Sequence, residues 1–320
     1  MSDFSEEDMS NINNSLEYIR QRALTPAEFV AECENRFDNI IEGIAERIAK
    51  SGRTEIVMLA GPSSAGKTTT AKKLCNALLA RGIGSYTVSL DDFYLNNSDA
   101  PLFPDGTPDF ETVNALDIPF FQQTMTKLAE TGEGELPEFD FVSGMRKPEL
   151  KKLKITDTDV IIVEGLHALN PVITEHLPQE RLLKIYINVS SRIYDGNGRI
   201  VLNKRNMRFV RRLVRDYKFR GNSVEKTFEM WIKVRYGEDT YLFPFSDNAD
   251  IKINTIHLYE TCVLKDTAMR LLSQLPKDSP FYAESQRIIM NLSRFPRIDR
   301  SEIPDNSLLR EFVGCEKTEE

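Results

Sequence analysis

One segment of the chain has the residue types and spacing that bind the phosphates of a nucleoside triphosphate. Residues 61–68 read GPSSAGKT and match the pattern G-x-x-x-x-G-K-[ST] in full. Glycines permit the tight backbone path of such a loop, and the N–H groups at the start of the following helix attract anions. We therefore expect the Lys67 ammonium to reach the β- and γ-phosphates and the Thr68 hydroxyl to ligate Mg²⁺.

The neighbouring residues support this interpretation. An apolar run at residues 56–60 comes before the loop, and a helical stretch at residues 67–81 follows it. The motif requires this strand–loop–helix context, so a chance glycine-rich turn is the less favoured interpretation. We expect ATP as the nucleotide, with GTP as the alternative. The residues expected to hold it are Gly61, Ser63, Ser64, Ala65, Gly66, Lys67, Thr68 and Thr69.

Two carboxylates follow predicted strands, at positions that suit triphosphate chemistry. Asp91 follows the apolar run at residues 86–90, and Glu164 follows the run at residues 160–163. Mg²⁺ is usually held by one or two carboxylates together with phosphates and water. We therefore expect a metal site made of Thr68, Glu164 and Asp91. The alternative for either acid is a helix cap or an exposed strand end.

Asp91 is also the residue that we expect to face the hydroxyl group of the acceptor. An unperturbed aspartate has a pKa of about 3.9 and is a weak base at neutral pH. Phosphoryl transfer through a loose transition state needs little base catalysis early on, so orienting the hydroxyl is the larger contribution. Asp92 is the competing assignment. It is less favoured because successive side chains along a strand point to opposite faces.

A basic stretch lies in the second half of the chain. Residues 204–235 include 11 Lys and Arg residues and three acids, whereas the whole chain has a formal net charge of −8. Arg208, Arg212 and Arg215 fall on one face of a predicted helix, and like charges at this spacing favour a bound anion. We expect this stretch to close over the triphosphate as a lid, with a mobile turn at residues 218–221. The alternatives are a solvated helix face and a nucleic-acid patch, but few aromatic residues are interleaved for base stacking.

These side chains need a scaffold that brings them to one edge. Short apolar runs at residues 56–60, 86–90, 160–163, 183–189 and 251–254 alternate with helical stretches. This alternation predicts an α/β fold with a parallel sheet covered on both faces. Ligands of such sheets bind beyond the carboxyl ends of the strands, where the loop, Asp91 and Glu164 all lie. Residues 95–150 are rich in Pro, Gly, Asp and Phe, which predicts an irregular insertion over the sheet.

Composition narrows the class of protein. The chain has 320 residues, of which 41% are hydrophobic and 28% charged, as in a globular protein with a sizeable core. Its acidic balance argues against a nucleic-acid or membrane-surface partner. Cys33, Cys75, Cys262 and Cys315 are far apart and form no CxxC pair, which argues against a disulfide framework or a zinc cluster. Without a long apolar run, and with the acidic start MSDFSEEDMS, we expect a cytoplasmic protein.

Together these motifs resemble the uridine kinase/phosphoribulokinase family of P-loop kinases. The resemblance covers residues 55–255 and rests on GPSSAGKTTTAKKL, SLDDFY, DVIIVEG, RRLVRDYKFRG, DFETVNALD and FDFVSGMR. It implies a three-layer P-loop fold with an arginine-rich lid helix, and the use of ATP and Mg²⁺ on a small-molecule acceptor. We expect an N-terminal helical arm at residues 1–52, a kinase core at 53–255 with its lid at about 203–222, and a C-terminal helical extension at 256–320. A homo-oligomer stays open.

The resemblance also implies roles for individual residues. Asp91 and Lys67 would be catalytic together with Arg215 and Arg220. The substrate contacts would be Tyr94 and Arg146 near a base, Glu111 near ribose hydroxyls, and Phe139 and Arg212.

Three positions depart from the family pattern. Glu111 replaces the usual Asp, Phe139 stands where Tyr is common, and Gly144 stands where uridine and cytidine kinases commonly have a base-reading His. Loss of hydrogen-bonding groups weakens discrimination between bases. We therefore expect a kinase for a uridine- or cytidine-like nucleoside, with a sugar, polyol or organic acid as the alternative acceptor.

A regulatory nucleotide-binding ATPase is the alternative from another class. Residues 203–206, NKRN, nearly spell the NKxD guanine reader but lack its Asp, so we interpret them as coincidence.

Overall fold

The computed structural model describes residues 13–51, 56–141 and 143–314. The expectations for the first ten residues and for Cys315 lie outside these ranges. A five-stranded sheet has the strand order β11-β8-β1-β7-β2, and every neighbouring pair is parallel. Its strands are β1 (Ile56–Ala60), β2 (Ser85–Ser89), β7 (Val160–Gly165), β8 (Leu182–Asn188) and β11 (Ile251–Asn254).

The central strands are buried on both faces, which explains their continuous apolar sequences. Alternate side chains of β1 enter different cores: Val57 and Leu59 pack on one face of the sheet, and Met58 and Ala60 pack on the other. The predicted α/β fold class is confirmed, and the five predicted strands form with ends shifted by at most two residues.

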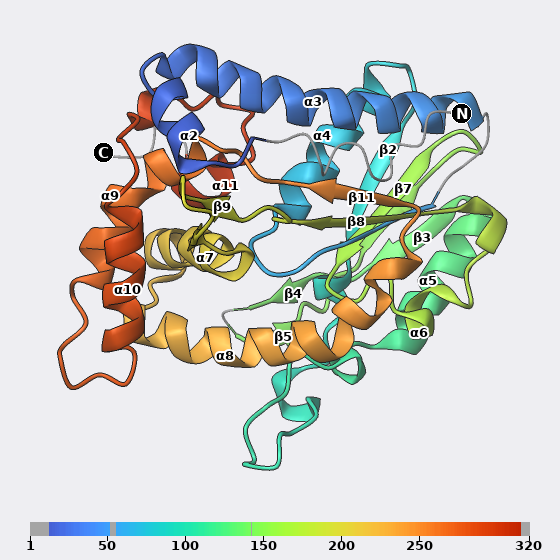
Figure 1. The fold of residues 1–320 in the computed structure, drawn as a ribbon. Coiled ribbons are helices and arrows are strands. Elements are labelled where there is room, and N and C mark those ends of the chain that lie inside the picture. Colours follow the sequence, from blue (N-terminus) through green and yellow to red (C-terminus); the bar gives the residue numbers. More distant parts are fainter. Residues whose placement is uncertain (1–12, 52–55, 142, 315–320) are drawn as a thin grey trace.

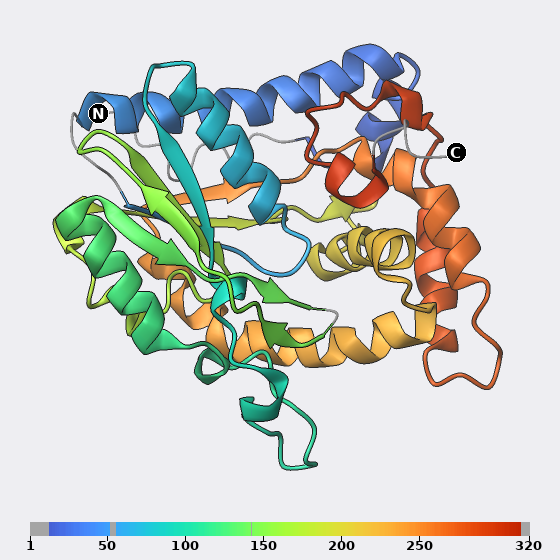
Figure 2. The same ribbon diagram turned by 180° about the vertical axis from the view of Figure 1, so that it is seen from behind.

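Helices cover both faces of the sheet and complete the three layers (Figures 1 and 2). The helices α3 (Pro26–Ser51) and α4 (Lys67–Leu79) pack on one face, and α5 (Ile118–Thr131) and α6 (Pro171–Thr174) pack on the other. The other helices are α2 (Leu16–Arg22), α7 (Lys204–Arg220), α8 (Val224–Tyr241), α9 (Glu260–Leu272), α10 (Tyr282–Leu292) and α11 (Arg310–Val313). Within the described ranges, no helix has both the length and the apolar character of a membrane span.

The segment at residues 95–150 is more regular than predicted. It contains α5, which starts at the N-cap Asp117 and ends at Gly132 with a φ of 70°. Antiparallel ribbons pair β3 (Glu133–Leu136) with β6 (Lys151–Lys154), β4 (Phe139–Asp140) with β5 (Met145–Arg146), and, further along, β9 (Ile193–Tyr194) with β10 (Ile200–Leu202). The prediction of an irregular insertion is therefore wrong for this helix. The many Pro and Gly residues around it favoured the prediction of irregular structure, although Asp117 and Gly132 are typical helix-capping residues.

The basic helix α7 is longer at its C-terminus than predicted. Lys218 and Arg220 belong to the helix, so the mobile turn expected there is wrong, and the chain leaves the helix at Gly221 with a φ of 63°. At the other end, the Asn203 side chain accepts a hydrogen bond from the N–H of Asn206 at 2.8 Å. The NKRN run is therefore a helix start, which accounts for its polar residues without a guanine site.

Candidate functional site

The phosphate-binding loop joins β1 to α4 at the carboxyl edge of the sheet. Gly61 needs its missing side chain, because a Cβ there would lie 2.6 Å from the carbonyl oxygen of Ile187. Gly66 is the N-cap of α4 and has a φ of 92°. The first N–H groups of a helix lack intrahelical acceptors, so those of Lys67 and the next two residues are free of helix bonds. The Lys67 Nζ donates to the carbonyl of Gly61 at 3.0 Å and curls over the loop.

The back of this loop is tied to the basic helix and its partners. The N–H of Ser63 donates to Glu238 Oε1 at 2.8 Å, and the hydroxyl of Ser63 accepts from Arg212 Nη1 at 2.7 Å. Arg208 and Arg211 donate to the carbonyls of Ser63 and Ser64. Ser63, one of the predicted nucleotide contacts, therefore already has its N–H, hydroxyl and carbonyl bonded to side chains of α7 and α8.

Arg208 and Arg211 do not form part of an open anion clamp. Arg208 makes a bidentate ion pair with Glu238, with both distances at 2.7 Å, and its side chain is 1% exposed. Arg211 pairs in the same way with Glu260 and is fully buried. The prediction that Arg208 lines a phosphate-facing stripe is therefore wrong, because charge periodicity cannot distinguish a buried ion pair from an open one.

The other arginines of α7 gather around one buried acid, Asp216. Arg215 donates to Asp216 Oδ1 from Nε at 3.1 Å and from Nη2 at 2.9 Å. Arg212 forms an ion pair with Asp216 at 3.1 Å, and Arg220 forms one at 3.6 Å. The carboxylate itself is fully buried, and we call this group the Asp216 hub. Three guanidinium groups on one carboxylate leave an excess of positive charge, which attracts an anion.

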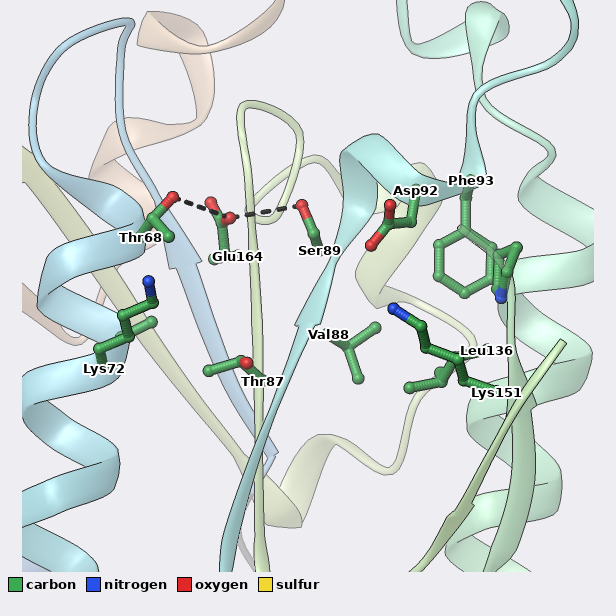
Figure 3. Close-up of a pocket in the computed structure, with 12 residues that line it drawn as sticks. Thr68, Lys72, Thr87, Val88, Ser89, Asp92, Phe93, Leu136, Lys151 and Glu164 are labelled. Carbon is green, nitrogen blue, oxygen red and sulfur yellow. Dashed lines mark hydrogen bonds between the residues drawn. The ribbon is translucent and has the colours of Figure 1, made fainter. Parts of the chain in front are cut away.

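Glu164 lies in the middle of the sheet edge, where its register neighbours are Leu59 on β1 and Ser89 on β2. Its Oε1 accepts hydrogen bonds from the hydroxyls of Thr68 and Ser89, both at 3.3 Å (Figure 3). The side chain is only 8% exposed, and burial raises the pKa of Glu164 to about 7, although the positive charge of Lys67 opposes this shift. A cation beside this carboxylate would relieve the cost of ionising it.

These oxygens suit Mg²⁺, which prefers hard ligands. Thr68 and Glu164 lie together on the wall of a cavity of about 280 Å³ that also contains Asp92, Lys72 and Lys151 (Figure 3). Over the ranges that the structure describes, no three His, Cys, Asp or Glu side chains group to hold a metal by themselves. Phosphate oxygens and water would therefore have to complete the coordination.

Asp91 and Asp92 lie in a 3₁₀ turn, Leu90–Phe93, and not on the strand. Alternation of side chains along a strand therefore does not distinguish Asp91 from Asp92. The two residues differ instead in the groups around them. Burial raises the pKa of Asp91, and the charges of Lys67 and Arg220 oppose that shift. Asp92 accepts a hydrogen bond from the N–H of Phe139 at 3.2 Å. Asp91 is thus the acid that interacts electrostatically with both Lys67 of the loop and Arg220 of α7.

An aromatic group lies beyond Asp91. The rings of Tyr94, Phe139 and Phe141 contact one another, with centroids 5.1 to 6.4 Å apart. The hydroxyl of Tyr94 donates to the carbonyl of Phe110 at 2.9 Å. The structure therefore brings Tyr94 and Phe139 together, as predicted from the sequence.

Glu111 packs against α8 on the same side. A Cβ added to Gly237 would lie 2.4 Å from the Cβ of Glu111, so the two segments are in close contact. Burial raises the pKa of Glu111 to about 7, and the positive charge of Arg212 opposes that shift. Arg212 therefore links the loop, the Asp216 hub and Glu111.

Arg146 is engaged in holding the local structure. Its guanidinium forms an ion pair with Asp117 at 3.1 Å and donates to the carbonyls of Phe93 and Tyr94. It therefore supports the turn that carries Asp91. Gly144 has a φ of 68°, and a Cβ there would lie 1.9 Å from Asn97 Nδ2, so any larger residue requires Asn97 to move.

Several residues around the site have a weak sequence signal or none. Asp216 stands four residues after Arg212, a spacing that indicates an ion pair on a helix. Nothing local indicates that Glu238 accepts a hydrogen bond from the N–H of Ser63, or that Glu311 accepts one from the hydroxyl of Thr69. His167, three residues after Glu164, is 2% exposed, and its ring lies against Tyr241. Burial lowers the pKa of His167 to about 4, so the ring is neutral at pH 7.

Comparison with known proteins agrees with this geometry. Residues 56–261 match the phosphoribulokinase/uridine kinase family. A uridine kinase of Lactobacillus helveticus (strain DPC 4571) is 26% identical over 207 residues, which cover 64% of this chain and 88% of that protein. A uridine kinase of Borrelia duttonii (strain Ly) is 29% identical over 201 residues, or 62% of this chain and 85% of that one. A solved structure from Silicibacter sp. TM1040, assigned provisionally as a fructose transport system kinase, has a TM-score of 0.50 at 21% identity. It covers 68% of this chain and 98% of that one, and the likeness concerns the fold alone.

Proposed function

The chain belongs to the phosphoribulokinase/uridine kinase family, and on this premise we propose that it transfers the γ-phosphate of ATP to a hydroxyl of a nucleoside-like acceptor. As a family member it is a phosphotransferase with a hydroxyl acceptor. One observation supports the finer assignment most strongly: the half-buried Asp91 lies within the electrostatic reach of both Lys67 and Arg220. A carboxylate that serves an acceptor hydroxyl beside a γ-phosphate needs this placement.

The donor is held by the phosphate-binding loop and by the Asp216 hub. Lys67 and the N–H groups at the start of α4 bind the phosphates, as in other helix N-terminal anion sites. Arg215 and Arg220, which exceed the charge of their shared acid, stabilise the negative charge that develops on the transferred group. Arg212 holds the loop through Ser63, and its charge acts on Glu111.

Thr68 and Glu164 would hold Mg²⁺, with Asp91 as a third oxygen source. When bound, this ion neutralises charge on the β- and γ-phosphate oxygens. Thr68 and Ser89 already orient the Glu164 carboxylate through their hydroxyls.

Asp91 orients the acceptor hydroxyl and receives its proton. The acceptor oxygen forms a bond to the γ-phosphorus while the bond from that phosphorus to the bridging oxygen breaks, and ADP leaves. Because burial raises the pKa of Asp91, it is a stronger base than an ordinary aspartate. A raised pKa supports the proposed base role, for which an aspartate of ordinary pKa is weak.

The acceptor side fits a nucleoside with weak base selection. Tyr94 and Phe139 offer an aromatic surface, and Glu111 offers a carboxylate for ribose hydroxyls. Gly144 supplies no side chain to read a base, and Arg146 is occupied by Asp117 and two carbonyls. These two features also favour the second candidate, a sugar, polyol or organic acid.

An ATP-consumption screen over nucleosides, sugars, polyols and organic acids tests this proposal. Lys67→Ala serves as the blank, and Lys50→Ala, at a lysine of α3 whose side chain is 73% exposed, serves as the control that should keep activity. Acceptor-dependent ADP release in the wild type, lost in Lys67→Ala, supports the kinase. ADP release that needs no acceptor would instead identify a regulatory ATPase, and a response to sugars or polyols alone would move the assignment to the second candidate.

A further inference from the structure

The last described segment of the chain, residues 307–314, returns to the centre of the molecule. It lies beyond residues 56–261, the part that matches the family. Leu308, Leu309 and Phe312 are fully buried, and Val313 is 2% exposed. All four belong to the same hydrophobic core as α4 and α7, so their burial stabilises the position of the segment. This C-terminal segment is therefore a fixed part of the fold.

The segment contacts the phosphate-binding loop directly. A Cβ added to Gly66 would lie 2.4 Å from Leu308 Cδ1, so Leu308 packs tightly on the loop at the start of α4. One turn further on, Glu311 Oε2 accepts a hydrogen bond from the hydroxyl of Thr69 at 3.0 Å. Thr69 is the last of the residues expected to hold the nucleotide.

The same segment also contacts the lid helix α7. The guanidinium of Arg211 lies 5.2 Å from the ring centroid of Phe312, and Lys218 Nζ donates to the carbonyl of Val313 at 2.8 Å. Arg215 Nη1 lies 3.9 Å from Glu311 Oε1. Glu311 thus stands between the first turn of α4 and an arginine of the Asp216 hub.

We infer that Glu311 is a positioning residue of the donor site, which sets the place of Arg215 relative to Thr69 before the triphosphate arrives. The inference rests on the proposed function. Glu311 is partly exposed, with 20% of its side chain accessible. A negative charge so close to the phosphates opposes binding of ATP, whereas a well-placed Arg215 favours the transition state. Glu311 therefore weakens ground-state binding and speeds turnover.

Glu311→Gln separates these two effects, because it keeps the size and the hydrogen bond to Thr69 but removes the charge. We expect the dissociation constant for ATP to fall about threefold, in line with one partly exposed charge. We expect kcat to fall about tenfold, because small misplacements of catalytic groups are costly. If Glu311 had only a structural role, Glu311→Gln would lower the melting temperature. It would not give a tighter binding of ATP together with a lower kcat.

Asp305→Asn is the matched control, because Asp305 lies two residues before this segment and its side chain is 93% exposed. It should leave ATP affinity and kcat within about twofold of the wild type. In an Arg215→Ala background, Glu311→Gln should change kcat by less than about twofold, since the two residues act as one unit. Additive effects there, or unchanged ATP affinity in Glu311→Gln, would overturn the inference.

Calorimetric titration with ATP needs no acceptor. It therefore measures the effect of Glu311→Gln on ATP affinity independently of the substrate screen. If Lys67→Ala also leaves ATP binding unchanged, the proposed donor site is itself wrong. If Lys67→Ala abolishes binding and Glu311→Gln behaves as the wild type, only the role of Glu311 fails.

Discussion

The buried carboxylate of Asp216 accepts two hydrogen bonds from Arg215, with Oδ1 at 3.1 Å from Nε and 2.9 Å from Nη2. The same carboxylate forms ion pairs with Arg212 and Arg220. One acid therefore holds all the lid arginines that we assign to the donor site. Removing that acid breaks the buried ion pairs of Arg212 and Arg215, although Arg215 keeps Glu311 at 3.9 Å and Arg212 keeps its hydrogen bond to Ser63. Breaking a buried ion pair by removing one partner is strongly destabilising.

Asp216→Asn should lower the free energy of unfolding by about 3–5 kcal/mol, the range for breaking a buried ion pair. Urea denaturation measures this loss. Asp239→Asn is the control, because Asp239 pairs with Arg205 on the surface, where the side chains are 48% and 41% exposed. The control should lose at most about 1 kcal/mol. Equal losses in the two variants would contradict the hub.

Glu164→Gln should stabilise the protein at pH 8, measured without Mg²⁺ and nucleotide. Burial raises the pKa of Glu164 from 4.5 to about 7. The folded state thus holds the proton more tightly than the unfolded state, so stability falls as pH rises through this window and levels off above it. Glutamine has no such dependence. The gain should be on the order of 2 kcal/mol at pH 8 and should nearly vanish at pH 4.

Thermal or urea unfolding of both proteins between pH 4 and 8 makes this comparison. Glu229→Gln, at a half-exposed position on α8, should track the wild type throughout. A difference in the free energy of unfolding between Glu164→Gln and the wild type that stays constant with pH, or that widens toward pH 4, would rule out a raised pKa of Glu164.

Gly237→Ala should impair the acceptor side alone. The new Cβ would lie 2.4 Å from the Cβ of Glu111, which is too close for either side chain to stay in place. We expect the KM for the acceptor to rise about tenfold, because loss of one polar contact typically has this effect. The ATP affinity should stay unchanged. Ile232→Ala, on the exposed side of α8, is the control, and a matching loss of ATP affinity in Gly237→Ala would contradict the assignment of Glu111.

Local patterns were enough to predict the fold class and the sheet edge at which the loop, Asp91 and Glu164 meet. Residues 61–68 and the strands before Asp91 and Glu164 are each encoded within a few neighbouring residues, so their meeting at one edge follows from parallel pairing. The 3₁₀ turn at Leu90–Phe93 could not be predicted in the same way, because strand ends depend on pairing with β7.

The ion-pair partners of the α7 arginines could not be predicted from the sequence. The positive charges of α7 are easily counted, but the partners of Arg208 and Arg211 are Glu238 and Glu260, 30 and 49 residues further along the chain. Glu311 reaches Thr69 across 242 residues. Such contacts depend on how elements pack, and no pattern of local spacing records them.

Asp91→Asn gives the most direct test of the central claim, which is that Asp91 serves the acceptor hydroxyl while Lys67 holds the donor. ATP affinity by calorimetry and acceptor-dependent ADP release are measured on the same preparation, beside Asp92→Asn. We predict that Asp91→Asn binds ATP within about threefold of the wild type and loses turnover by about 10²–10⁴-fold, the range for a positioned acid or base. Near-normal turnover in Asp91→Asn, or a larger loss in Asp92→Asn, would contradict the account.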